Sequence, residues 1–293
     1  MPNVSWVKDL RAYSYSSMSN YLQCPRSFFF YKVLGMRDED NVYTVKGHMV
    51  HKTLEVLMTL AQKGVNYAVE EIFNSVWDKT NRIYPHLLAQ LDKTALLNTV
   101  YVVQKDFRLE GDIVGLEKRL VLLIDKDTDN AIYVSDKEDV PQDCSDCFVV
   151  VGYMDLLTQN EDGIQIVDWK TGKKKSKAYH EKDLQYKVYS TGAMLMYPEY
   201  NHNKITFAYI NEKRIAPETL EVKATSLTKN IGEMRKTCKA IERDRQFKPK
   251  DGWLCDWCNH RPYCNEVTND IKQCKDKAVI RKKVDYMRRN LGV

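Results

Sequence analysis

The chain has 293 residues and is 43% hydrophobic, which is ordinary for a globular protein and enough for one large core or two modest ones. No apolar run approaches the roughly 18 residues that a membrane span needs, and the polar beginning lacks a secretion-signal core, so we expect a cytoplasmic protein with no membrane partner. The net charge of +5 comes from segment 272–289, which holds eight basic and two acidic residues. That tail could contact a polyanion, although a solvated helix is the commoner explanation of such a run.

The first predicted element is helical, over residues 16–34, and Pro25 interrupts it. Cys24 directly precedes this proline. Taken alone, a cysteine there is most simply a small buried apolar residue. The aromatic run that follows is expected in the core, at Phe28, Phe29, Phe30 and Tyr31.

A polar loop is predicted over residues 35–46, followed by a helix over 47–61. This helix has an apolar stripe at Val50, Leu54, Leu57 and Met58. His51 lies at the edge of the stripe, where a histidine is ordinarily a helix-surface residue. Residues 67–83 and 87–109 are also predicted to be helical, and they carry no chemical motif, so we interpret them as scaffold.

Residues 113–124 are predicted to form a strand, in which Glu117 stands within an apolar run. An acidic loop, residues 125–146, comes next and contains Cys144 and Cys147. One C-x-x-C pair without a second is a weak zinc signal. Because eight cysteines in a reducing compartment are not expected to form disulfides, we expect these two to be ordinary loop thiols.

The segment 148–172 has the pattern of a β-hairpin, with strands over 148–157 and 164–170 and a turn at 160–163. Asp155 and Asp168 lie on these apolar strands, where an uncompensated charge is costly. Asp168 and Lys170 point to the same face because side chains alternate along a strand, and hairpin pairing can bring Asp155 beside them. Two acids and a lysine suit metal-assisted hydrolysis of a phosphodiester. The alternative is a solvated surface ion pair.

After the hairpin, residues 173–177 are strongly basic, and residues 181–196 are predicted to be helical. Gln185 and Tyr189 stand one turn apart in this helix and so share a face. Two strands, 204–211 and 220–224, and a helix, 226–245, are predicted next. Cys238 belongs to the apolar stripe of that last helix and is expected in the core.

The segment 253–264 contains three close cysteines, at Cys255, Cys258 and Cys264. Three thiolates are one ligand short of a tetrahedral site, and Cys24 could supply the fourth. His260 keeps a zinc site with three cysteines and one histidine possible. Thiolates alone do not choose between zinc and a [4Fe–4S] cluster.

The run Gly152-x-x-Asp155, followed by Asp168-Trp169-Lys170, resembles the core motif of the PD-(D/E)xK nuclease superfamily in its RecB-like branch. Met154 stands where that motif has its nominal proline. Gly47-x-x-x-His51 matches the family's histidine motif, and Gln185-x-x-x-Tyr189 matches its motif bordering the active site. The placement of Cys24 and the later three cysteines resembles that of the iron–sulfur exonucleases, including the CRISPR-adaptation "Cas-four" nucleases and the AddB nuclease domain.

The resemblance implies an α/β fold, namely a restriction-endonuclease-like core with a central mixed sheet flanked by helices. A carboxy-terminal iron–sulfur module would pack on the amino-terminal helices. We divide the chain into a helical portion with the cluster cysteine and the histidine motif, a nuclease core, and a cysteine module with the basic tail, over residues 1–110, 111–250 and 251–293. They are expected to form one integrated domain.

The resemblance also implies the site. Mg²⁺ or Mn²⁺ would be held by His51, Asp155, Asp168 and the Trp169 carbonyl. Lys170 would orient the attacking water or stabilise charge, with Glu117 as an auxiliary acid and Gln185 and Tyr189 bordering the site. DNA backbone contacts are expected from Lys173, Lys174, Lys175 and Gln185, and cluster ligation from Cys24, Cys255, Cys258 and Cys264.

The function implied is a metal-dependent DNA exonuclease that acts from the ends of single strands, in recombination, repair or CRISPR-type processing. Its cofactors would be Mg²⁺ or Mn²⁺ and a structural [4Fe–4S] cluster, with structural Zn²⁺ as the alternative. No P-loop motif occurs, so a helicase partner would be a separate chain. The alternatives are a DNA-binding adaptor subunit with weak nuclease activity and a structure-specific endonuclease.

Overall fold

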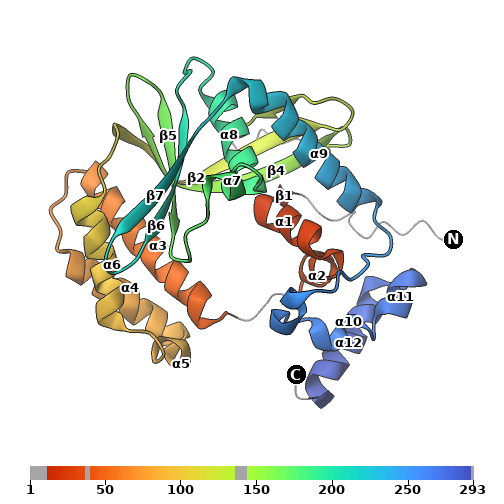
Figure 1. Ribbon diagram of the computed structural model, residues 1–293. Helices are drawn as coiled ribbons and strands as arrows, with labels where there is room; N and C mark the ends of the chain where they lie inside the picture. Colours follow the sequence, from red (N-terminus) through yellow and green to blue (C-terminus); the bar gives the residue numbers. More distant parts are fainter. Residues whose placement is uncertain (1–11, 37–39, 136–143, 292–293) are drawn as a thin grey trace.

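The computed structural model describes residues 12–36, 40–135 and 144–291, and a seven-stranded mixed sheet lies at their centre (Figure 1). The strands follow the order β3-β2-β4-β5-β6-β7, and β1 pairs with β4 outside this path. The pairs β1–β4 and β5–β6 are parallel and the others antiparallel. The strands span Tyr13–Ser14, Asp112–Asp125, Ala131–Tyr133, Cys147–Gln159, Ile164–Lys170, Lys204–Ile210 and Ile215–Glu221. The predicted α/β class with a central mixed sheet flanked by helices is confirmed.

Helices cover both faces of this sheet (Figure 1). One face packs on α8 (Leu184–Met196) and α9 (Leu227–Arg243), and the other on α3 (Val42–Gln62), α4 (Val69–Ile83) and α6 (Lys93–Asp106). The strand β5 is therefore apolar on both sides, as buried central strands are. Ile164 and Ile166 belong to the first core, and Val167 and Trp169 to the second.

The helix with the histidine motif begins five residues before the predicted start, because part of the predicted loop is its first turn. Asn41 caps α3, and its side chain accepts hydrogen bonds from the backbone of Tyr43 and Thr44. The Thr44 hydroxyl in turn accepts from the Asn41 backbone, which completes a capping box. Polar residues that suggest a loop thus form the cap. Residues 37–39 of the predicted loop lie outside the described residues.

Capping aspartates divide one predicted helix and delay the start of another. The predicted helix over 87–109 is α5 (Pro85–Leu88) followed by α6, with Asp92 accepting from the Ala95 backbone. The predicted helix over 181–196 is α8 preceded by the short α7 (Lys177–His180), with Asp183 accepting from the Gln185 backbone. Aspartate favours a helix start over a helix interior because its side chain competes for nearby backbone amides.

The strands also depart from prediction in two places. The acidic loop contains the short strand β3, and residues 136–143 of that loop lie outside the described residues. The last strand is β7, which begins at Ile215 and ends at Glu221 instead of spanning 220–224. Pro217 within it obscures the strand pattern. A proline is tolerated there because β7 is an edge strand and needs fewer backbone donors.

The amino-terminal helical segment breaks at the predicted proline into α1 (Tyr15–Gln23), α2 (Pro25–Phe28) and the π-helical turn η1 (Phe29–Val33). The carboxy-terminal segment packs against it with η4, α10, α11 and α12, over Trp253–Trp257, Arg261–Cys264, Thr268–Lys272 and Lys277–Leu291 (Figure 1). Arg26 of α2 is 2% exposed and joins the amino-terminal helices to the carboxy-terminal part of the chain. Its guanidinium donates to the carbonyls of Phe247 and Cys264 at 2.9 and 2.7 Å.

The basic tail forms α12, which buries Ile280 and Val284 in the main core. Cys238 is fully buried there as well, as predicted. No helix among the described residues is long and apolar enough to cross a bilayer.

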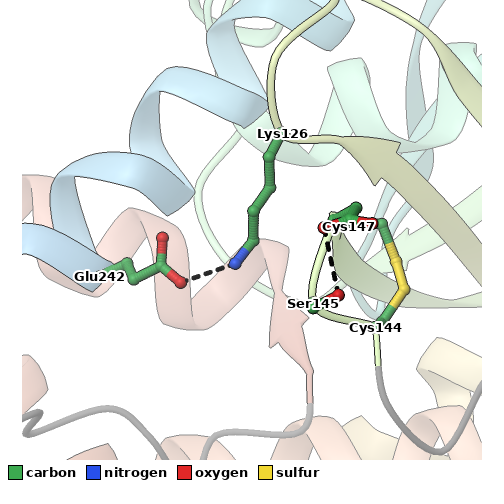
Figure 2. The surroundings of a disulfide bond; sticks show 6 residues. Lys126, Cys144, Ser145, Cys147 and Glu242 are labelled. Atoms are coloured by element: carbon green, nitrogen blue, oxygen red, sulfur yellow. Dashed lines mark hydrogen bonds and ion pairs between the residues drawn. A yellow bond between two sulfur atoms is a disulfide. The ribbon is translucent and has the colours of Figure 1, made fainter.

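The structure corrects the prediction for Cys144 and Cys147, which form a disulfide (Figure 2). The turn that leads into β4 brings their Cα atoms to 5.3 Å, within the range a disulfide can bridge. The C-x-x-C spacing therefore reflects a local covalent bond and neither separate thiols nor half of a zinc site. Beside it, Lys126 and Glu242 form an ion pair of 2.8 Å that joins the end of β2 to α9 (Figure 2).

Candidate active site

The two hairpin aspartates lie where β4 and β5 separate. The last paired residues of these strands are Leu156 and Val167, and Asp155 and Asp168 are the next residues along each strand. The Asp155 carboxylate accepts a hydrogen bond of 2.8 Å from the Trp169 backbone N–H. The two strands therefore separate at the two aspartates.

A first cluster combines His51 from α3, Glu117 from β2 and Asp155 from β4. One ligand atom from each residue lies within 4.8 Å of the others, and His51 Nδ1 is 3.2 Å from Asp155 Oδ2. Among the described residues this is the one group of at least three such side chains close enough to hold a metal ion. The carboxylate oxygens suit a hard divalent cation of the Mg²⁺ or Mn²⁺ type.

A second cluster surrounds Asp168, which is 3% exposed. Lys170 Nζ lies 2.6 Å from its Oδ2, and Gln185 Nε2 donates to its Oδ1 at 2.5 Å. Gln185 Oε1 accepts from the same lysine at 2.9 Å, so one amide holds both charged groups. The Tyr189 hydroxyl accepts from Gln185 at 3.1 Å and donates to the carbonyl of Tyr153.

The motif glycine permits this arrangement. A Cβ on Gly152 would lie 3.3 Å from ring and methyl carbons of Tyr189 and Val188, which is a crowded contact. The missing side chain therefore lets α8 approach β4 closely. That approach brings Gln185 and Tyr189 within hydrogen-bond reach of the hairpin.

Burial and mutual repulsion shift the titration of these groups. Burial raises the pKa of Asp168, and the charge of Lys170 opposes that rise only in part. Burial, followed by the charge of Asp155, raises the pKa of Glu117. Burial lowers the pKa of His51, but the hydrogen bond and charge of Asp155 outweigh it, so the pKa lies above its ordinary value. A bound cation would reverse this balance by favouring the deprotonated forms.

The structure thus brings together His51, Glu117, Asp155, Asp168, Lys170, Gln185 and Tyr189. It groups Glu117, rather than Asp168, with His51 and Asp155. The Trp169 side chain is buried in the second core, against Phe107, with ring centroids 4.8 Å apart.

The predicted DNA-binding lysines are exposed on the loop after β5, outside both clusters. Lys174 pairs with Glu218 at 3.2 Å, and Lys175 lies over the ring of Tyr179 at 5.2 Å. Lys173 is exposed beside them.

One neighbour of the site is absent from the sequence predictions. Tyr15 packs edge-on against Tyr189, with ring centroids 6.1 Å apart, and burial followed by the charge of Asp168 raises its pKa to about 12. Its position depends on the packing of α1 against α8, which no local pattern indicates.

The four predicted cluster cysteines line one cavity of about 340 Å³, formed by Cys24 on one side and Cys255, Cys258 and Cys264 on the other. Burial raises the pKa of Cys264, and although Arg26 lowers it, the charges of the other three thiols raise it further. Cys264 is therefore near enough to each of the other three cysteines to interact with it. His260 also lines the cavity, whereas Cys274 does not. The donor set fits a group ligated by four thiolates.

No curated protein matches the chain. A solved structure, titled "Crystal structure of SSO0001", is 13% identical over 86% of this chain and 95% of that chain, with a TM-score of 0.30. The family model described as the PD-(D/E)XK nuclease superfamily matches residues 12–265, which include both clusters and all four cavity cysteines. The chain belongs to the PD-(D/E)XK nuclease superfamily.

Proposed function

We propose that this chain is a Mg²⁺- or Mn²⁺-dependent deoxyribonuclease that hydrolyses phosphodiester bonds from the ends of single-stranded DNA. The observation that carries the proposal is the meeting of a histidine–carboxylate cluster with a buried aspartate–lysine pair at the fork of β4 and β5. The first can hold a cation, and the second places a positive charge beside it. Both are needed where negative charge develops on a phosphate.

In this mechanism His51, Glu117 and Asp155 would hold the metal, and Asp168 and the Trp169 carbonyl would supply further oxygen ligands. The metal would lower the pKa of a coordinated water and offset charge on the phosphate. The Lys170 ammonium, held between Asp168 and Gln185, donates hydrogen bonds to the attacking water or to the phosphate oxygens. Tyr189 keeps Gln185 in place.

The loop lysines Lys173, Lys174 and Lys175, together with Gln185, contact the DNA backbone. Such contacts are independent of base sequence, so little sequence specificity is expected. Degradation from single-stranded ends would serve recombination, repair or CRISPR-type processing, with a separate motor protein opening the duplex.

The cavity cysteines are proposed to hold a structural [4Fe–4S] cluster. Four thiols around one cavity suit such a cluster, and structural Zn²⁺ is the alternative. Phosphodiester hydrolysis transfers no electrons, so the role of the cluster would be to hold the two ends of the chain together.

The test is digestion of end-labelled DNA that is single- or double-stranded, linear or circular, with Mg²⁺ or Mn²⁺. Linear single strands should be degraded and closed circles spared. Asp155→Asn and Lys170→Ala should abolish the activity while Lys118→Gln, a charge change on β2 outside both clusters, retains it. Full activity in well-folded Asp155→Asn protein would overturn the proposal, and rapid cutting of circles would replace it by an endonuclease.

A further inference from the structure

The sheet carries a second polar pair one step along the strands from the metal cluster. Arg119 on β2 pairs in register with Tyr153 on β4, two residues from Glu117 and Asp155 respectively. Two residues span about 7 Å along a strand, a distance on the scale of one nucleotide. The pair is thus placed where a nucleotide adjoining the reacting phosphate would lie.

Both side chains belong to the sheet face opposite α8. The neighbour Lys118 points toward α8, since its Nζ lies over the ring of Tyr197 at 5.9 Å. Gly152, the neighbour of Tyr153, also faces α8, because a Cβ there would touch Tyr189 and Val188. Alternation therefore directs Arg119 and Tyr153 to the other face, where Asp155 contacts His51.

Arg119 has an unpaired donor atom, and Tyr153 has an exposed ring. The Nε of Arg119 is buried and has no hydrogen-bond partner among the described residues, which is costly for a charged donor. Tyr153 is 54% exposed, although aromatic rings ordinarily bury most of their surface. A guanidinium binds phosphate through paired hydrogen bonds, and a tyrosine ring stacks on nucleic-acid bases.

We propose that Arg119 and Tyr153 form a subsite for one nucleotide of single-stranded DNA beside the metal cluster. Arg119 binds the phosphate next to the scissile one, and Tyr153 stacks on the attached base. This assignment rests on the proposed nuclease function, because it takes the metal cluster as the place of the scissile phosphate. Both residues position the substrate and neither takes part in the chemical step.

The first experiment measures the affinity of the full chain for a labelled single-stranded oligonucleotide without divalent metal, over a series of salt concentrations. Arg119→Gln should weaken binding about 10- to 150-fold, as the loss of a hydrogen bond to a charged group does. The slope of log K against log salt should decrease by about 0.7, the value for one phosphate contact on a single strand. Lys118→Gln is the matched control, since it removes a neighbouring charge on the opposite face.

Tyrosine stacking is tested separately. Tyr153→Ala should weaken binding about 5- to 150-fold, and Tyr153→Phe should keep wild-type affinity because the ring remains. Tyr101→Ala, which removes a 40% exposed tyrosine on α6, is the control. An abasic nucleotide at the proposed position should weaken binding to wild type and leave Tyr153→Ala unaffected.

The second experiment uses oligonucleotides with one uncharged methylphosphonate linkage, moved along the strand. Wild-type protein should bind more weakly when the methylphosphonate stands next to the cleaved linkage. The Arg119→Gln variant should bind that oligonucleotide as tightly as the unmodified one. Wild-type affinity and salt slope in Arg119→Gln would overturn the subsite, as would a lowered Tm with unchanged affinity, which would make Arg119 structural.

The experiments distinguish failure of the subsite from failure of the proposed nuclease function. If wild-type protein binds single-stranded DNA through Arg119 but cleaves DNA with neither Mg²⁺ nor Mn²⁺, the nuclease function is refuted and the subsite stands. A wild type that cleaves with Arg119→Gln and Tyr153→Ala unaffected refutes the subsite alone.

Discussion

Glu117 lies opposite Asp155 between β2 and β4, in a position where Glu117 has a positive φ of 46°. The flanking residues pair regularly, Leu116 with Leu156 and Lys118 with Met154. A non-glycine residue in this left-handed region costs about 1 kcal/mol or more. The strained backbone holds two like charges close together, an arrangement that becomes favourable when a cation lies between them.

Every substitution of Glu117 should lower metal affinity, because it removes a ligand. A substitution that also relieves the backbone strain at this position should raise the stability of the protein. Glu117→Gly removes both the carboxylate and the strain, whereas Glu117→Ala removes the carboxylate and keeps the strain. We expect both variants to bind Mn²⁺ more weakly than wild type. Glu117→Gly should be about 1 kcal/mol more stable than Glu117→Ala. Thermal melting and Mn²⁺ titration check this, and equal stability of the two variants would show that the backbone is unstrained.

Metal affinity should rise with pH. The pKa values of Glu117 and His51 lie above their ordinary values in the metal-free protein, Glu117 by burial and the charge of Asp155, His51 because Asp155 outweighs burial. A metal ion binds the deprotonated forms, so protons compete with it until the pH exceeds these raised values. Titration calorimetry at about pH 6 and about pH 8, in buffers of different ionisation enthalpy, checks this. The metal should bind more tightly at the higher pH, and its binding should release protons from the protein at the lower pH. Equal affinity at both would exclude His51 as a ligand.

Gln185 should affect turnover more than metal binding. Its amide joins Asp168 to Lys170 and is not part of the His51, Glu117 and Asp155 cluster. Gln185→Ala should lower kcat about 10- to 100-fold, with Mn²⁺ affinity nearly unchanged, since a displaced charged group loses a few kcal/mol of transition-state stabilisation. Gln185→Glu should lower kcat at neutral pH as well, because a second carboxylate beside Asp168 raises their pKa values further.

An exposed amide outside both clusters provides the control. Gln90→Ala on the α5–α6 connection should match wild type in kcat and in metal affinity. A Gln185→Ala enzyme with wild-type kcat would show that Lys170 does not need this support.

The structure brings together the residues that the sequence singles out, but in a different grouping. The resemblance to the family's motifs is what points to His51, Gln185 and Tyr189, because spacing alone only places each of them on a helix face. The pairing of Glu117 with Asp155 depends on the strand register and on a positive φ, and Tyr15 depends on the packing of α1 against α8. These are long-range relationships, which local patterns do not encode.

The predicted ends of several helices differ from the observed ones because local residue type is ambiguous. Asn41, Asp92 and Asp183 are polar residues that resemble loop but cap helices. As a result one helix begins earlier than predicted at Asn41, one is divided at Asp92, and one begins later than predicted at Asp183. The disulfide of Cys144 and Cys147 was excluded by an expectation about compartment, whereas turn geometry decides whether two nearby thiols can meet.

The last prediction concerns Cys24, which stands about 230 residues before Cys255 and shares its cavity. A four-thiolate cluster closes this long loop, and closure restricts the unfolded chain most when the ligands are far apart in sequence. Cys24→Ser should therefore lower cluster content and Tm together, with activity falling as the protein unfolds. Anaerobically purified wild-type protein should be brown and should contain about four iron atoms and about four acid-labile sulfides per chain. Cys274→Ser, outside the cavity, is the control and should keep both. Colourless wild type with stoichiometric zinc would refute the cluster and leave the metal site at the β4–β5 fork untouched, because no cavity cysteine belongs to that site.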